Sequence, residues 1–145
     1  MAVDVLINNA GFGDYGAFQE SDRTKQLDMI RLNILALTDL THLFLPSMVE
    51  RKSGHIINVA SIAAFQPMPY LSVYAATKAF VLSFSEALWA EVKPHGVKIL
   101  ALCPGPTDTQ FFQVANFSDS MNEQSPQSMT PEAVVQEALK SMAED

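Results

Sequence analysis

Three short runs of β-branched and aliphatic residues, each ended by a turn, constrain the fold of this chain most; they cover residues 3–7, 55–61 and 97–103. Apolar runs of this length are typical of strands that are buried on both faces of a parallel sheet. Long helical stretches separate the runs, and parallel strands need such crossover connections. The sequence therefore predicts an α/β fold, a partial doubly wound parallel sheet of about three strands with flanking helices.

The first helix is expected to begin at Ser21 or Asp22, since either side chain can cap it, and to end at Gly54. Pro46 is expected to kink this helix or to begin a separate last turn. Its apolar residues recur at three- and four-residue steps, which indicates the stripe Leu27, Ile30, Ile34, Leu37 and Leu40.

A second helix is predicted from near Ser72 to near Gly96, and a third over residues 131–142 with Thr130 as its cap. The apolar stripe of the second helix comprises Phe80, Val81, Phe84, Leu88 and Val92. Residues 110–129 are polar and irregular apart from a few aromatic positions, so we expect a lid with an apolar inner face that covers an apolar substrate.

Composition narrows the possible functions. The 145 residues are 48% hydrophobic and suit one globular domain, and a net charge of −7 with nine basic residues argues against binding of nucleic acid. The apolar runs are short and interrupted, so no membrane span or signal peptide is expected, and a cytoplasmic location is the default. The single Cys103 is interpreted as a small core residue, and the three histidines show no metal-ligand spacing, so no metal site is predicted.

Tyr74 and Lys78 lie four residues apart, downstream of Ser61, and on a helix this spacing places them on one face, one turn apart. An isolated tyrosine has a pKa of about 10, and lowering it to near 7 takes roughly 4 kcal/mol of phenolate stabilisation. A cation about 4 Å away supplies energy of that size at an effective dielectric of about 20. Many helices show such a pair by chance, so a structural role for both residues stays open.

Five motifs occur in a fixed order along the chain, and this order indicates a protein family. They are Asn8-Asn9-Ala10-Gly11, Asn33, Ser61, Tyr74-Ala75-Ala76-Thr77-Lys78 and Pro104-Gly105-Pro106-Thr107-Asp108-Thr109. This series resembles the motifs of the short-chain dehydrogenase/reductase family. The resemblance implies a Rossmann-like fold and an NAD(P)-dependent oxidoreductase that interconverts a carbonyl and an alcohol by hydride transfer.

The resemblance also implies a role for each catalytic residue. Tyr74 would give or take the proton on oxygen, while Lys78 would lower the pKa of Tyr74 and hold the nicotinamide ribose. Ser61 would hydrogen-bond the carbonyl oxygen, and Asn33 would hold a water in a relay to Lys78. Without the resemblance, the favoured interpretation of Asn33 is a satisfied structural amide and that of Ser61 is a turn or cap residue at a strand end.

The cofactor-binding residues implied by the resemblance are Asn8, Ala10, Gly11, Tyr74, Lys78, Pro104, Gly105, Thr107 and Thr109. Residues 1–145 would be the C-terminal part of a single NAD(P)-binding domain, because nothing upstream of Val3 corresponds to the family's glycine-rich cofactor turn. The residue that distinguishes the ribose hydroxyl of NAD from the 2′-phosphate of NADP lies in the same missing part of the domain. The expected cofactor is therefore NAD or NADP. Residues 11–20 contain three glycines but do not match the dinucleotide fingerprint, and a plain loop is predicted there.

The two long helices carry more apolar surface than one sheet face needs. In the family the corresponding helices pair between subunits, so a homo-oligomer is implied, and burial inside one chain is the alternative. Two other hypotheses stay open beside a small-molecule oxidoreductase. One is a truncated, non-catalytic fragment that retains only this helix-pair surface, and the other is a broken gene product without a function of its own.

Overall fold

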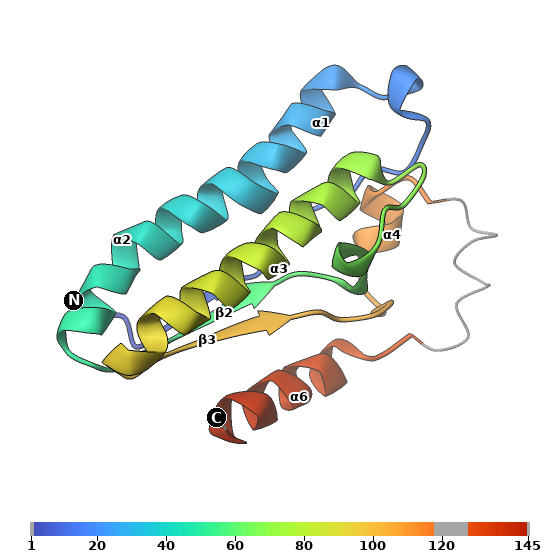
Figure 1. Ribbon diagram of the computed structural model, residues 1–145. Coiled ribbons are helices and arrows are strands. Elements are labelled where there is room, and N and C mark those ends of the chain that lie inside the picture. Colours follow the sequence, from blue (N-terminus) through green and yellow to red (C-terminus); the bar gives the residue numbers. More distant parts are fainter. Residues whose placement is uncertain (1, 118–127, 145) are drawn as a thin grey trace.

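The computed structural model describes residues 2–117 and 128–144. Strands β1 (Val5–Asn8), β2 (Gly54–Val59) and β3 (Val97–Leu102) form one parallel sheet in the order β1-β2-β3. The register pairs Val5 with His55 and His55 with Lys98. This arrangement confirms the predicted α/β class, with three parallel strands and helices on both sides of the sheet (Figure 1).

Two long helices lie side by side over one face of the sheet (Figure 1). The first is continuous and consists of α1 (Arg23–Ile30), the π-helical turn η2 (Arg31–Ala36) and α2 (Leu37–Glu50), and the second is α3 (Ser72–Val92). Helix α6 (Pro131–Glu144) packs against β3 from the other side, where Lys98 Nζ donates to the Met142 carbonyl. The short helices are η1 (Phe18–Glu20), η3 (Ile62–Phe65), η4 (Lys93–His95) and α4 (Phe111–Val114).

Helix ends follow the capping residues of the sequence. The Asp22 carboxylate accepts from the Thr24 amide at 2.8 Å, so Asp22 and not Ser21 caps α1. After α3 and η4 the chain turns at Gly96, whose φ of 71° lies in the left-handed region that glycine tolerates best. The Thr130 hydroxyl accepts from the Ala133 amide, which confirms the predicted start of α6.

The predicted end of the first helix is wrong. Helix α2 continues through Pro46 and ends at Glu50, and Gly54 is the first residue of β2. A Cβ on Gly54 would lie 2.5 Å from the buried Met48 Cγ, so glycine is needed there for close approach of helix and strand. The irregular part of the helix is η2, not the proline.

The side of the long helix that faces the sheet follows the predicted aliphatic stripe only in part, since Leu37 of that stripe is buried. Ile30 is 39% exposed and Leu40 is 41% exposed, so both lie largely on the outer side. Helical periodicity does not tell which of two apolar faces is buried when a helix carries both. The residues that are buried are Gln26, Met29, Asn33, Leu37, Thr41 and Met48. On α3, Phe80 of the predicted stripe is likewise 37% exposed.

The helix from Arg23 to Glu50 is long and apolar enough to cross a membrane, judged by length and composition alone. This finding corrects the expectation that no apolar run in the chain is long enough. A core helix of a globular domain passes the same test. Here the inward side chains of Asn33 and Thr41 hydrogen-bond to α3 and β1, so the helix is held on the sheet.

A buried amide network fastens the carboxyl ends of the strands to the helices. Asn58, fully buried in the central strand, accepts from Asn8 Nδ2 at 2.8 Å and donates to Ser85 Oγ at 2.9 Å. Asn8 Nδ2 also donates to Thr41 Oγ1 at 3.1 Å. The network therefore joins β1, β2, α2 and α3 beside the strand ends, where open α/β sheets bind ligands.

Candidate active site

Ser61 and Tyr74 come together at the end of β2. Ser61 follows the strand and begins η3, where its hydroxyl accepts from the Ala63 amide at 3.1 Å. Tyr74 lies in the first turn of α3, is only 8% exposed, and has the Ser61 side chain near enough to its phenol to affect the pKa of that group. The predicted pairing of a serine at a strand end with a helical tyrosine is therefore present in the fold.

Lys78 lies one helical turn after Tyr74 on the same inward face of α3, as its spacing predicts. Its Nζ is 5.8 Å from the centroid of the Tyr74 ring and donates to the Val59 carbonyl at 2.8 Å. Because Val59 is the last residue of β2, this bond fixes the ammonium at the carboxyl end of the central strand.

Burial is the main cause of the pKa shifts of Tyr74 and Lys78. Desolvation raises the pKa of Tyr74 above 10.0, and the nearby Ser61 side chain offsets part of the rise. Desolvation also lowers the pKa of Lys78 from 10.5 to about 8, against a smaller opposite effect of the half-buried Cys103. The prediction that Lys78 lowers the pKa of Tyr74 stays a prediction, because in this fold desolvation outweighs the other influences on that pKa. At neutral pH the phenol therefore keeps its proton.

Gly11, Asn33 and Lys78 converge on one point. A Cβ on Gly11 would lie 3.0 Å from Asn33 Oδ1 and 3.4 Å from Lys78 Nζ, so a side chain there would crowd both groups. The turn after β1 is thus placed directly beside the ammonium of Lys78. This convergence joins three of the motifs that the sequence showed only in linear order.

Asn33 makes three hydrogen bonds within the chain, which use both N–H groups of its side chain. Its Oδ1 accepts from the Phe12 amide at 3.1 Å, and its Nδ2 donates to the Phe12 carbonyl and to Thr77 Oγ1, each at 3.0 Å. The amide thus clamps the loop after β1 onto α3, which is the structural interpretation that the sequence left open. Its place in the π-helical turn η2 fits the frequent occurrence of such turns at functional sites.

The other predicted cofactor-binding residues follow β1 and β3. Ala10 and Gly11 are exposed, whereas the side chain of Asn8 points inward into the amide network, so only its backbone is available to a ligand. The Ile62 amide donates to the Pro104 carbonyl at 3.1 Å, which holds the turn at Gly105 close to Ser61.

Two threonine hydroxyls after this turn have local partners. Thr107 Oγ1 donates to the Gly105 carbonyl at 3.0 Å. Thr109 Oγ1 accepts from the Phe111 amide at 3.2 Å, at the start of α4. In this arrangement both side chains shape the 104–110 turn itself.

Sequence reasoning missed Thr77 and Phe111. The Thr77 hydroxyl donates to the Tyr74 carbonyl at 2.7 Å while it accepts from Asn33, and so it links two predicted catalytic residues. The ring of Phe111 lies 5.1 Å from the ring of Tyr74. Thr77 stands at a variable position within a motif, and Phe111 was assigned only to a lid over residues 110–129. Residues 118–127 of that lid lie outside the described residues.

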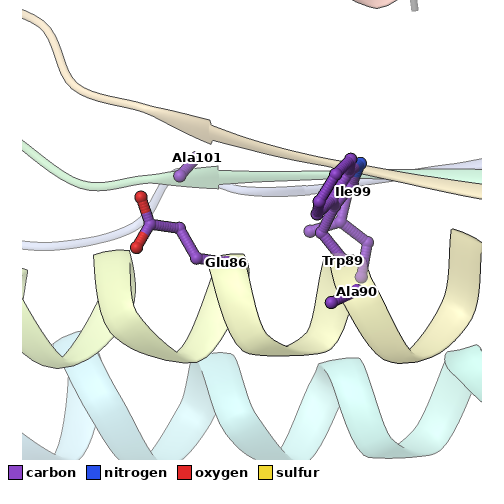
Figure 2. A pocket seen from close by; sticks show the side chains of 5 residues that line it. All are labelled: Glu86, Trp89, Ala90, Ile99 and Ala101. Carbon is purple, nitrogen blue, oxygen red and sulfur yellow. The ribbon is translucent and has the colours of Figure 1, made fainter.

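A hollow of about 400 Å³ lies elsewhere, between α3 and β3 (Figure 2). It is lined by Glu86, Trp89, Ala90, Ile99 and Ala101. These helical residues belong to the C-terminal half of α3, whereas Tyr74 and Lys78 belong to its N-terminal half. The candidate site therefore rests on the convergence of polar groups at the strand ends and not on this hollow.

The low pKa of Lys78 makes stability depend on pH. The unfolded lysine binds its proton below pH 10.5 and the folded one only below about pH 8, so stability rises with pH within this window. We expect the unfolding free energy of the wild type, minus that of Lys78→Met, to increase by about 2 kcal/mol between pH 8 and pH 10. Urea titrations at three pH values measure this difference; a pH-independent difference would contradict a buried, desolvated ammonium.

A family model described as short chain dehydrogenase matches residues 1–119. The chain is 42% identical over 103 residues to the ketoacyl reductase HetN of Nostoc sp., a match that covers 71% of this chain and 36% of that protein. It is 35% identical over 143 residues to the very-long-chain 3-oxoacyl-CoA reductase of Anas platyrhynchos, covering 96% and 44%. The chain thus spans less than half the length of these curated relatives.

Two solved structures match over nearly the whole chain. A short-chain dehydrogenase from Sphingobium yanoikuyae in complex with NADPH superposes with a TM-score of 0.90 at 33% identity, covering 98% of this chain and 54% of that one. A 3-ketoacyl-(acyl-carrier-protein) reductase from Brucella melitensis complexed with NADH gives a TM-score of 0.84 at 27% identity, covering 95% and 59%.

Proposed function

This chain belongs to the short-chain dehydrogenase family, and from this premise we propose that the protein containing it is an oxidoreductase that reduces a carbonyl to an alcohol with NADH or NADPH. The observation that carries the proposal is the convergence of Ser61, Tyr74 and Lys78 at the carboxyl end of β2. Reductases among the curated relatives support the same direction of reaction.

The proposal assigns proton transfer to Tyr74. Burial keeps its phenol protonated at neutral pH, which suits donation of a proton to a carbonyl oxygen as that oxygen gains negative charge. Ser61, whose side chain lies near the Tyr74 phenol, would donate to the same oxygen. Lys78 would return a proton to the phenolate after the reaction, because a pKa of about 8 lets its ammonium release one at little cost.

The residues present fit a nicotinamide cofactor. Gly11 is exposed and has no side chain, so a ligand can approach its backbone closely. A Cβ at this position would lie 3.4 Å from Lys78 Nζ. A ligand at Gly11 would therefore have the Lys78 ammonium within reach as a donor to a ribose hydroxyl. A bound nicotinamide would supply the hydride. In this proposal Asn33 fixes the backbone at Phe12 through its two hydrogen bonds there. We also propose that Asn33 holds a water molecule that relays protons to Lys78.

We also propose that the protein is a homo-oligomer. Large apolar side chains on the two long helices are exposed, and they include Ile30, Leu35, Leu40, Leu43 and Phe80. Leu35 and Leu43 are each about two thirds exposed, at 64% and 66%. Exposed apolar side chains in this number on adjacent helices favour an interface, and a second copy of the same helix pair is the occupant of matching chemistry. The same surface would serve the second candidate function, a non-catalytic interaction module.

Nucleotide titration of the purified chain tests this function. NADH or NADPH is expected to bind saturably, to quench Trp89 fluorescence and to raise the melting temperature, because a ligand that binds only the folded state stabilises it. Gly11→Val should abolish these effects, and ATP serves as the control nucleotide. Sedimentation velocity of the same samples is expected to give a mass above that of one chain. A folded oligomer that binds neither nicotinamide nucleotide would favour the interaction module instead.

A further inference from the structure

One buried carboxylate outside the candidate catalytic set accepts three hydrogen bonds from side chains. The side chain of Asp14 is only 8% exposed. Its Oδ1 accepts from Lys25 Nζ at 2.6 Å and from Asn116 Nδ2 at 2.9 Å, and its Oδ2 accepts from Gln26 Nε2 at 2.7 Å. These donors come from α1 and from the turn after α4. Asp14 therefore ties together segments that are about a hundred residues apart in the sequence.

Hydrogen bonds to backbone carbonyls also join the loop after β1 and helix α1 to the end of α4. The Tyr15 amide donates to the Ala115 carbonyl at 2.7 Å, and Lys25 Nζ also donates to the Val114 carbonyl at 3.4 Å. Asn116 has a φ of 60°, which asparagine tolerates better than most residues. The end of α4 is thus fixed to the loop after β1. We call residues 111–117 the strap.

The strap lies on the candidate proton donor. The ring of Phe111 is 5.1 Å from that of Tyr74, and both rings press against Gly13. A Cβ on Gly13 would lie 2.9 Å from Phe111 Cζ and 3.2 Å from Tyr74 Cδ2. Next along the chain, Asp14 forms its bonds to the other end of the strap. The position of Phe111 over Tyr74 is therefore coupled to the contacts of Asp14.

An ordinary surface ion pair would not hold two distant segments together. Asp28 and Arg31 form one at the same 2.6 Å, but their side chains are more than half exposed and lie three residues apart on one helix. Such exposed pairs contribute little to stability. The Asp14 carboxylate is shielded from water and has three donors from two other segments, so its neutralisation leaves the half-buried Lys25 without a counter-charge.

We propose that Asp14 is a positioning residue whose carboxylate latches the strap over Tyr74 and so makes Phe111 the apolar wall of the substrate site. The substrate class that fits this wall is a carbonyl compound with an apolar or aromatic group next to the carbonyl. This inference rests on the proposed function, because it takes Tyr74 as the group that meets the carbonyl.

Hydrogen exchange tests the latch independently of any activity. In Asp14→Asn the amides of Tyr15 and Ala115 are expected to exchange at least about tenfold faster than in the wild type, while amides of β2 do not change. Asp28→Asn, which removes the same charge from an exposed pair, is the matched control. Asn116→Gly removes one bond to Asp14 but permits the positive φ, and it should give a smaller effect in the same amides. Wild-type exchange rates in both latch variants would overturn the proposal.

Steady-state kinetics test the assignment of Phe111 as the apolar wall of the substrate site. With acetophenone as the probe, Asp14→Asn and Phe111→Ala are expected to raise KM about tenfold while kcat changes less than about threefold, and acetone should show no such rise in KM. Faster exchange without this rise in KM would overturn the assignment of Phe111. If the wild type reduces neither ketone, the proposed function fails, whereas the exchange comparison still upholds or overturns the latch.

Discussion

Tyr74→Phe is expected to lower the kcat of carbonyl reduction by about 10²–10⁴-fold, the range typical of a lost general acid. The substitution removes only the phenolic hydroxyl, whose pKa the nearby Ser61 side chain affects. The ring and its contact with Phe111 are retained, so the fold should not change. The loss of rate should appear in kcat more than in KM, because the proton is needed in the transition state.

Tyr70→Phe is the matched control for this experiment. Tyr70 is 56% exposed and lies just before α3, so it undergoes the same chemical change outside the site. Its rate should stay within about twofold of the wild type. The fall in nicotinamide absorbance with a ketone measures all three rates. If Tyr74→Phe and Tyr70→Phe were equally active, Tyr74 could not be the proton donor.

Asn58→Leu is expected to destabilise the fold by about 3 kcal/mol, a large fraction of the stability of an ordinary domain. The substitution leaves a donor of Asn8 and an acceptor site on Ser85 without their partner in the interior. Buried polar groups that lose a partner cost more than the bond contributed, since no water replaces it. Four elements meet at this network, so the loss should affect global unfolding and not only one strand.

Asn9→Leu is the control for this prediction. Asn9 is exposed and adjoins Asn8 in the turn after β1, so the same substitution there should change stability by less than about 0.5 kcal/mol. Urea unfolding of both variants measures the difference. The pair Asn58→Leu and Ser85→Ala should also be less destabilising together than the sum of the two, because they share one hydrogen bond. Equal stability of the two leucine variants would argue against an energetic role of the network.

Local structure could be predicted from the sequence because its causes are local. The three strands lie where apolar runs end in turns, within about two residues, and Asp22 and Thr130 cap the helices that follow them. Where the prediction failed, packing was responsible. Gly54 belongs to a strand because Met48 occupies the space of its side chain, and this contact cannot be deduced from a glycine in a sequence.

The family and the helical placement of Tyr74 and Lys78 were also available from the sequence. The match of the family model to residues 1–119 confirms the resemblance that the ordered motifs indicated. A four-residue spacing on a helix fixes which side chains share a face, whatever the rest of the chain does. The roles of Ser61, Tyr74, Lys78 and Asn33 in catalysis stay predictions that the proposed experiments address.

The sequence by itself thus determined the strands, the caps, the family and the face that Tyr74 shares with Lys78, because each depends on neighbours within a few residues or on motif order. Only the tertiary structure decided that the pKa of Tyr74 rises, that Asn8 turns inward to Asn58, and that Asp14 holds a segment a hundred residues away. The physical reason is that desolvation and buried hydrogen bonds depend on which distant atoms surround a group. The identity of those distant atoms cannot be deduced from sequence periodicity or motif spacing.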